Sequence, residues 1–249
     1  KETVFYFTTC GWMMWNWLVS NLALGATIVL YDGSPFHPDS STMWQMAEEF
    51  GITVFGTSAK FIAACQGYGV VPKDRYDLSL IKTILSTGSP LVEESFDYIY
   101  GSVKEDVQLS SITGGTDIVS SFAGGNAMLP VYRGEIQCRA LGMKVESFDN
   151  AGKPVINQKG ELVCTRAFPS VPVNFWNDPD GSKFHNAYFS DYSGVWTHGD
   201  YILINDHGGV IVFGRSDATL NPAGVRIGTA EIYRVVEAFP EIEDSLAVG

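Results

Sequence analysis

Two short turns hold the residues best suited to contact a bound ligand. "STGSP" (Ser86 to Pro90) follows the apolar run "IKTIL", and "ITGGTD" (Ile112 to Asp117) follows "DVQLSS". Their small residues let backbone come close to a ligand, and Thr116 and Asp117 add a hydroxyl and a carboxylate. Each turn alone would be an ordinary tight turn. Two such turns after neighbouring parallel strands indicate a ligand site, because ligands bind beyond the carboxyl ends of these strands.

A second polar group lies later in the chain. "WTHGD" places Asp200 directly after Gly199, where its carboxylate could accept two hydrogen bonds from a vicinal diol such as a ribose. A turn aspartate that bonds its own backbone is the alternative. "GRSD" adds Arg215 as a candidate for ribose or phosphate, although an isolated arginine is usually structural. We assign His198 a structural role, since the sequence pairs it with no orienting carboxylate.

The elements that position the first two turns alternate between strand and helix. Strand patterns such as "VFYF", "ATIVLY", "ITVFGTS" and "IKTIL" are separated by helical patterns of about ten residues. One helix is expected in "TTCGWMMWNWLVS", where Trp12, Trp15, Leu18, Val19 and Leu22 recur at spacings of three and four and predict one buried stripe. This alternation predicts βαβ crossovers and a mostly parallel sheet with flanking helices.

The pattern changes farther along the chain. Between about residues 129 and 213, short strands are set off by Gly, Pro, Asn and Asp with little helical periodicity, which predicts an antiparallel region, a small barrel or sandwich. A polar connector and the amphipathic run "TAEIYRVVEAF" follow. We therefore predict an α/β region over 1–128, a β-rich, barrel-like subdomain over 129–216 and the start of a small α+β domain over 217–249.

Composition excludes several classes of protein. The chain has 249 residues, 45% of them hydrophobic, which is typical of a globular fold. The net charge of −12 argues against a nucleic-acid partner, whose phosphates require a basic face. Its four cysteines are widely spaced and predict neither a zinc site nor a disulfide framework. No apolar run reaches the roughly 20 residues of a membrane span, and no signal peptide is evident, so a cytoplasmic location is expected.

Read in order, "STGSP", "ITGGTD", "GELV", "WTHGD" and "GRSDATLNPAGVRIGTAEI" resemble the successive motifs of the adenylate-forming acyl-CoA synthetase superfamily. The resemblance covers nearly the whole chain, and "SSITGGTD" with "GVRIGTAEIY" is most similar to the branch that acts on acetoacetate. It implies a two-step ligase. A carboxylate attacks the α-phosphate of ATP to give an acyl-adenylate, and the thiol of coenzyme A then displaces AMP. ATP, Mg²⁺ and coenzyme A are the cofactors that this reaction implies.

The resemblance also implies roles for single residues. The adenine and phosphates of ATP would contact Gly88, Ser89, Pro90, Gly115 and Thr116. The ribose would contact Asp200 and Arg215. Thr116, Asp117 and Arg226 would be the catalytic group, with Asp117 holding Mg²⁺. Asp217 would be the hinge of the C-terminal domain, and Gly224 would approach coenzyme A. The acyl pocket would be shaped by Trp12, Met13, Thr87 and Gly114, while Trp15, Trp17 and Leu18 would only pack.

Three departures from the family pattern matter. Most relatives carry Glu where this chain has Asp117, a shorter side chain that can still bind a hard cation. Relatives that activate acetate carry paired tryptophans at Thr113 and Gly114, so Gly114 makes room for an acid larger than acetate. The chain also lacks the family's phosphate loop before Lys1 and its C-terminal lysine. We therefore expect an internal piece of a longer protein that cannot complete adenylation by itself.

Two alternatives stay open. Within the same family, the acid could be propionate, butyrate or a hydroxy acid, because Gly114 does not choose among acids larger than acetate. From another class, the chain could be a non-catalytic nucleotide-binding module. The presence together of Thr116, Asp117, Asp200, Arg215 and Arg226 argues against a module that has lost its chemistry.

Overall fold

The computed structural model describes residues 1–216 and, beyond them, Ile232, Val235, Val236, Phe239, Ile242 and Ser245. The chain forms two compact units. The first comprises Lys1–Thr116 and Gly125–Gly134, and the second comprises Asp117–Gly124 and Glu135–Gly249. Most of the predicted C-terminal region, 217–249, lies outside the described residues.

The first unit contains a five-stranded sheet in the order β2-β1-β3-β4-β5, in which every pair of neighbours is parallel. Its strands are β1 (Thr3–Tyr6), β2 (Thr27–Val29), β3 (Val54–Ser58), β4 (Thr83–Thr87) and β5 (Gln108–Ser111). The helices are α1 (Met13–Ser20), η1 (Asn21–Leu24), α2 (Thr42–Glu49), α3 (Ala59–Gly67), η2 (Pro72–Asp74), α4 (Glu93–Tyr98) and η3 (Ile99–Val103). The predicted parallel sheet with flanking helices is confirmed.

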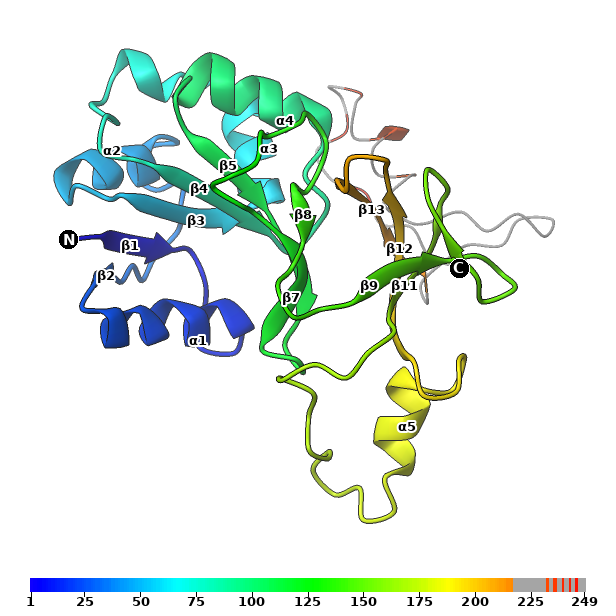
Figure 1. Cartoon of the computed structure of the whole chain (residues 1–249). Coiled ribbons are helices and arrows are strands. Elements are labelled where there is room, and N and C mark those ends of the chain that lie inside the picture. The colour runs from blue at the N-terminus through cyan, green and yellow to red at the C-terminus, as the bar shows by residue number, and fades with distance from the viewer. Residues whose placement is uncertain (217–231, 233–234, 237–238, 240–241, 243–244, 246–249) are drawn as a thin grey trace. The chain divides into compact units, whose positions relative to one another are not determined.

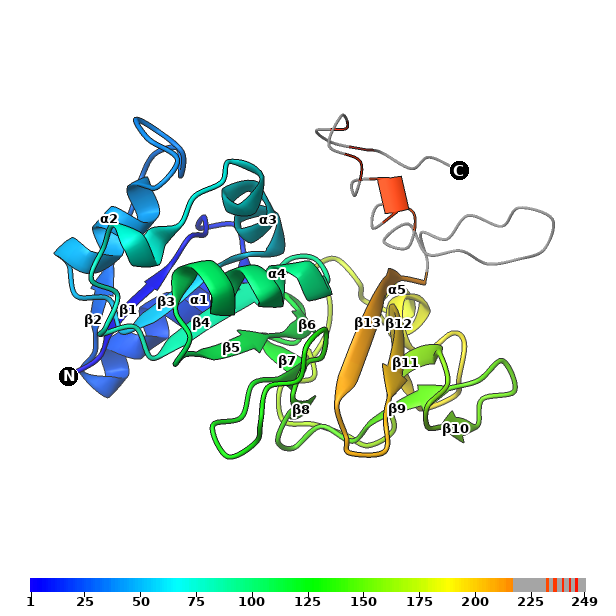
Figure 2. The ribbon, with the colours of Figure 1, turned by 90° about the horizontal axis from the view of Figure 1, so that it is seen from above.

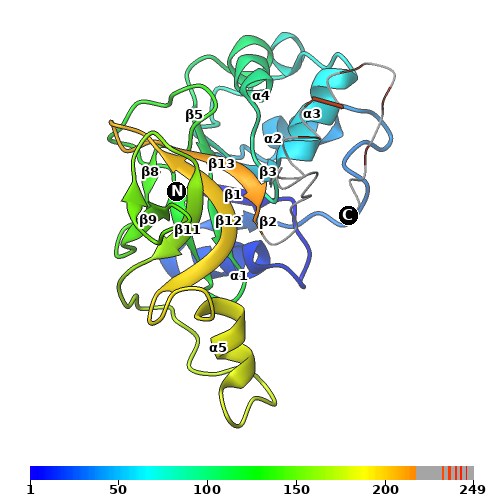
Figure 3. The same cartoon turned by 90° about the vertical axis from the view of Figure 1, so that its right-hand side faces the viewer.

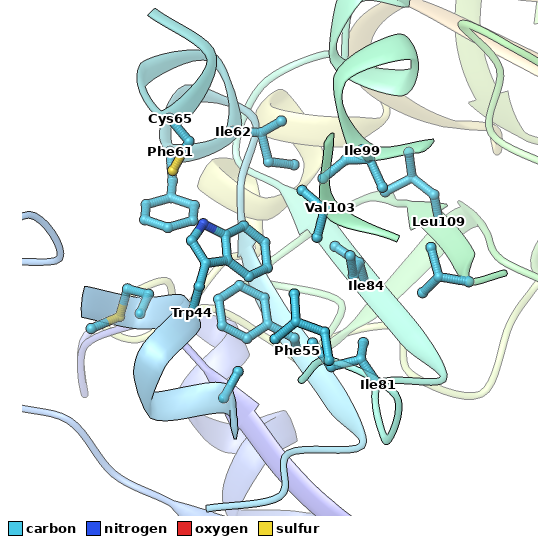
Figure 4. Packing of buried hydrophobic residues seen from close by; sticks show 14 of the residues in the cluster. Trp44, Phe55, Phe61, Ile62, Cys65, Ile81, Ile84, Ile99, Val103 and Leu109 are labelled. Atoms are coloured by element: carbon cyan, nitrogen blue, oxygen red, sulfur yellow. The ribbon is translucent and has the colours of Figure 1, made fainter. Parts of the chain in front are cut away.

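Helices cover both faces of this sheet (Figures 1 and 2). On the face that carries α2, α3 and α4, Trp44 stacks on Phe55 with ring centroids 4.7 Å apart, and Phe61 packs beside them (Figure 4). On the other face, α1 packs with a smaller cluster that includes Tyr6. Successive side chains of β4 point to opposite faces of the sheet. Ile84 therefore packs in the cluster with Trp44, and Leu85 packs in the cluster with Tyr6.

The buried face of α1 differs from the predicted stripe. Met14 and Leu18 are buried, whereas Trp12 is 65% exposed, Leu22 53% and Val19 36%. The prediction of a helix here was correct, but its orientation was wrong. The spacing of three and four fitted two neighbouring stripes, and packing against Tyr6 selected the Met14–Leu18 stripe.

The second unit is built on an antiparallel sheet in the order β10-β9-β11-β12-β13 (Figure 2). Its strands are β9 (Val145–Phe148), β10 (Pro154–Val155), β11 (Gly160–Cys164), β12 (Trp196–Ile204) and β13 (Val210–Arg215). A further pair, β7 (Ser120–Gly124) with β8 (Cys138–Arg139), is also antiparallel. The predicted antiparallel texture is present, while closure into a barrel stays a prediction.

A helix that the sequence did not predict, α5 (Ser182–Tyr188), lies in the second unit. The buried carboxylate of Asp178 accepts hydrogen bonds from the backbone N–H groups of Lys183 (3.0 Å) and Phe184 (2.9 Å). It thereby satisfies donors that a helix start leaves without intrahelical partners. Within the described part of the chain, no helix is long and apolar enough to cross a membrane.

The contact between β1 and β3 predicts a sensitive position. Tyr6 is the cross-strand partner of Gly56, and a Cβ added at Gly56 would lie 2.1 Å from the Tyr6 ring. We expect Gly56→Ala to destabilise the protein by about 1–3 kcal/mol, measured by urea denaturation. Gly67→Ala is the control, because nothing lies within 4 Å of its new Cβ. Equal denaturation midpoints for the two variants would contradict this account of the packing.

Candidate functional site

The two polar turns of the first unit lie at the same edge of its sheet. β4 and β5 are parallel neighbours, and Ser86 pairs with Ser111 at the end of their ladder. The backbone N–H of Ile112 donates to the carbonyl of Ser86 (3.0 Å), and the Thr87 hydroxyl donates to the carbonyl of Ile112 (3.2 Å). The predicted juxtaposition of "STGSP" with the start of "ITGGTD" is therefore confirmed.

The turn after β4 exposes its backbone. Gly88 has a φ of 93°, a left-handed conformation that favours glycine, and Gly88 and Ser89 are both exposed. Pro90 is half-buried. After β5 the chain forms the short strand β6 (Thr113–Gly115), whose residues are half-buried, and Thr116 is exposed directly after it. Both turns thus offer backbone and hydroxyl groups to solvent at the edge where α/β sheets bind ligands.

Met13 is the predicted acyl-pocket residue that the structure places beside this edge. It packs in one cluster with Leu85 and Ile112, which are two residues before Thr87 and Gly114. Trp12 precedes α1 and is 65% exposed, so it is not part of that cluster. Trp17 packs against the cluster and Leu18 is buried in it, in agreement with the packing role that the sequence predicted for them.

In the second unit, Asp117 is exposed and accepts a hydrogen bond from the hydroxyl of Tyr188 on α5. The ring of Tyr188 stacks on Trp196, with centroids 3.6 Å apart and planes 13° apart. Sequence reasoning missed Tyr188, because 71 residues separate it from Asp117 and the helix that carries it was not predicted.

Asp200 lies in the middle of β12 rather than in a turn, opposite the last residue of β13, and charged groups surround it. Its carboxylate lies 3.7 Å from the guanidinium of Arg215 and 3.6 Å from Nε2 of His198. Arg215 also donates to the backbone carbonyl of His198 (3.3 Å). Asp200 and Arg215 are cross-strand partners, so the structure brings together the two residues predicted to contact a ribose.

The structure corrects one inference about His198. The sequence gave no carboxylate to pair with it, yet Asp200 is that carboxylate, two positions away on the same strand. Gly199 between them has a φ of 81°. The imidazole is buried and packs against Phe122 with ring centroids 4.7 Å apart, which agrees with the structural role predicted for it.

Glu161 on β11 is a further acidic group that the sequence did not reveal as special. Its carboxylate accepts a hydrogen bond from the backbone N–H of Gly199 (3.0 Å) and another from the Ser216 side chain. Burial raises the pKa of Glu161 to about 7, and the nearby charges of Asp200 and Asp191 add to the rise, although the two hydrogen bonds oppose it. The segment of β12 that carries Asp200 therefore contacts a partly buried acid.

Three predicted residues, Asp217, Gly224 and Arg226, lie outside the described residues. Within the described part, no group of three or more His, Cys, Asp or Glu side chains could hold a metal ion by itself. An exposed carboxylate such as Asp117 fits Mg²⁺, which proteins commonly bind through one or two carboxylates together with substrate phosphates. The four cysteines form no disulfide with one another.

A hollow of about 620 Å³ runs along the edge strand β2 of the first unit, lined by residues such as Ile28, Val29, Met46 and Phe50. None of the predicted site residues lines it. Its lining lacks the clustered acids, bases and small turns that nucleotide chemistry requires, so we do not assign it to the candidate site.

Comparison with known proteins finds similarity to acetoacetyl-CoA synthetases. The chain is 57% identical over 248 residues to the acetoacetyl-coenzyme A synthetase of Rhizobium meliloti, with 100% of this chain and 38% of the relative covered. It is 54% identical over 249 residues to that of Danio rerio, with 37% of the relative covered. No protein-family model matches. The chain thus spans about two-fifths of the length of the curated relatives it matches.

Two solved structures are similar. Acetoacetyl-CoA synthetase from Streptomyces lividans matches with a TM-score of 0.91 and 48% identity, over 100% of this chain and 38% of that one. The anthranilate CoA ligase AuaEII, in complex with anthranoyl-AMP, matches with a TM-score of 0.77 over 93% of this chain and 43% of that one. At 17% identity it supports the fold alone. The predicted resemblance to acetoacetyl-CoA synthetases, within the adenylate-forming superfamily, is confirmed.

The raised pKa of Glu161 predicts a pH-dependent stability. Folded Glu161 binds its proton more tightly than the unfolded chain does, so its favourable contribution is complete below about pH 4.5 and is lost as pH rises towards 7. We expect Glu161→Gln to gain about 1–2 kcal/mol relative to the unchanged protein between pH 5 and pH 8, after allowance for solvent screening. Urea denaturation at both pH values measures this change.

The exposed Glu105 supplies the control for that measurement, since Glu105→Gln alters the same charge without the burial. Its stability difference from the unchanged protein should be the same at pH 5 and pH 8. If the difference for Glu161→Gln is equally flat, the carboxyl of Glu161 is not buried as described.

Proposed function

We propose that this chain is part of an ATP-dependent acid–CoA ligase that activates acetoacetate as an acyl-adenylate and transfers it to coenzyme A. The observation that carries the proposal is the match over the whole chain to acetoacetyl-CoA synthetases, at up to 57% identity. The two polar turns at the carboxyl ends of β4 and β5 support it, because that edge is where such a sheet binds a nucleotide.

In the first unit, the proposed adenine contacts are Gly88, Ser89 and Pro90. The left-handed Gly88 keeps side-chain atoms away from the turn, so that a flat base can approach the backbone. Gly115 and Thr116 are proposed to contact phosphate through backbone and hydroxyl groups. The hydrogen bond from Thr87 to Ile112 would keep the two turns at a constant separation while the ligand binds.

In the second unit, Asp200 is proposed to accept two hydrogen bonds from the ribose hydroxyls. The guanidinium of Arg215, 3.7 Å from this carboxylate, would add a donor beside it. Asp117 is proposed to hold Mg²⁺, which would neutralise the charge of the phosphates. We also propose that the antiparallel sheet is the β-rich, barrel-like subdomain of such a ligase.

The acyl pocket is proposed to be shaped by Trp12, Met13, Thr87 and Gly114. Met13 is supported by its packing with Leu85 and Ile112. The remaining assignments, Asp217 as hinge, Gly224 near coenzyme A and Arg226 near phosphate, follow from the resemblance and form part of the same proposal.

No side-chain nucleophile is required for this chemistry. The substrate carboxylate attacks the α-phosphate, pyrophosphate leaves, and the thiol of coenzyme A then attacks the acyl carbon and releases AMP. Adenylyl transfer of this kind depends on positioning and charge neutralisation. The proposed residues orient the base, the ribose and the phosphates, and none of them forms a bond to the substrate.

The proposal is tested on a protein of the relatives' full length that contains this chain. Coenzyme A-dependent AMP release from ATP would be followed with acetoacetate, acetate, butyrate and 3-hydroxybutyrate in parallel. We expect acetoacetate to have the highest kcat/KM. Turnover that favours another of the acids would keep the ligase and replace its substrate. The absence of turnover with all four would favour a nucleotide-binding module.

The role of Gly114 gives a sharper prediction. Gly114 lies in the extended strand β6, where a large aromatic residue is compatible with the backbone. We expect Gly114→Trp to lower kcat/KM for acetoacetate at least about 10-fold relative to acetate, because the new ring fills the space for the longer acid. The KM for ATP is the internal control and should change little. An unaltered ratio of the two acids would remove Gly114 from the pocket.

A further inference from the structure

The hydroxyl of Tyr188 donates a hydrogen bond to Oδ2 of Asp117, and both residues lie in the second unit. The contact joins the turn before β7 to the last residue of α5, which lies close to the start of β12 (Figures 1 and 3). Asp117 is exposed to solvent, so the phenol reaches a carboxylate that a ligand could also reach.

The Tyr188 ring has little freedom to move. One face stacks on Trp196, which is buried, and its edge meets Phe184 and Phe175 at centroid distances of 6.1 and 6.0 Å. Edge-to-face contacts of this kind contribute about 0.5–1.5 kcal/mol each beyond the area that they bury. The start of α5 is itself anchored by the buried carboxylate of Asp178. Ring packing and the anchored helix thus hold the Tyr188 hydroxyl in place next to Asp117.

The Tyr188 hydroxyl is the donor of this hydrogen bond, and the Asp117 carboxylate is its acceptor. Such a charge-assisted hydrogen bond is stronger than one between neutral groups and fixes the plane of the carboxylate.

We propose that Tyr188 is a positioning residue, which holds the carboxylate of Asp117 in the orientation that binds the cation accompanying a nucleoside triphosphate. This inference rests on the proposed function, in which Asp117 binds Mg²⁺. It adds a residue that no motif in the sequence indicates. The phenol occupies Oδ2 and orients the carboxylate as a neighbouring hydrogen-bond donor orients a metal ligand.

The shorter side chain at this position explains why such support would be needed. An aspartate reaches one methylene less far than a glutamate, so its oxygens must be placed by the local backbone and by neighbouring donors. The backbone here is a turn, in which Val119 adopts a left-handed φ of 47°. A rigid phenol on an adjacent element would limit the rotation of the carboxylate, which reduces the entropy lost when a cation binds.

The test compares ATP affinity with and without the cation, in a protein of the relatives' full length. Calorimetry gives Kd for ATP in the presence of Mg²⁺ and in the presence of EDTA, and their ratio measures the contribution of Mg²⁺. We expect Tyr188→Phe to reduce this ratio, taken as Kd in EDTA divided by Kd in Mg²⁺, about 10-fold, because Kd in Mg²⁺ rises while Kd in EDTA stays the same. The ring that stacks on Trp196 is retained, so the fold should be unaffected, which circular dichroism can check.

Tyr192→Phe is the matched control, because it removes a hydroxyl that bonds only the backbone carbonyl of Asp149 among the contacts described (3.4 Å). It should leave the ratio unchanged. In a protein that already carries Asp117→Asn, Tyr188→Phe should have no further effect on the ratio. An unchanged ratio for Tyr188→Phe alone, or an equal loss of affinity with and without Mg²⁺, would overturn the inference. Failure of the unchanged protein to bind ATP would instead refute the proposed function.

Discussion

The parallel register of β4 with β5 is the constraint on which the first unit's candidate site depends. Ser86 and Ser111 face each other at the end of the ladder, so both strands stop at the same level and both chains turn there. Hydrogen bonds from Ile112 to Ser86 and from Thr87 to Ile112 extend this alignment beyond the strands. The register is itself held by burial of Ile84 on one face and Leu85 on the other, because a slip of one residue would exchange them.

In the second unit, the candidate site depends on the strand β12. At its start, Trp196 is buried among aromatic rings and supports Tyr188 by stacking. Four residues later, Asp200 lies opposite Arg215 of β13. The strand β12 thus carries Trp196, which packs against Tyr188, and also the carboxylate of Asp200. Gly199 has a left-handed φ of 81° where the pairing of β12 with β11 is irregular. Its backbone N–H donates a hydrogen bond to the Glu161 carboxylate.

The sequence predicted well those features that depend on local patterns. The strands around "IKTIL" and "DVQLSS" were expected, and so was the proximity of the turns that follow them, because parallel strands align their carboxyl ends. The face of α1 was not predictable, since apolar residues occur on more than one side of that helix and only tertiary packing chooses between them. The helix α5 was missed because the carboxylate that anchors its start, Asp178, lies four positions before its first residue, and the intervening "PDG" suggests a loop.

The acids of the second unit show why local reasoning has this limit. Asp200 and Glu161 are similar in chemistry and each follows a glycine, and only Asp200 was predicted to contact a ligand. In the structure their environments differ, because Asp200 has the Arg215 guanidinium within 3.7 Å, whereas burial dominates at Glu161 and raises its pKa to about 7. A partly buried acid is thus retained beside the segment of β12 that carries Asp200, where its carboxylate accepts the backbone N–H of Gly199. Its burial has a cost in stability, which is expected where a polar group must be held in place for a ligand.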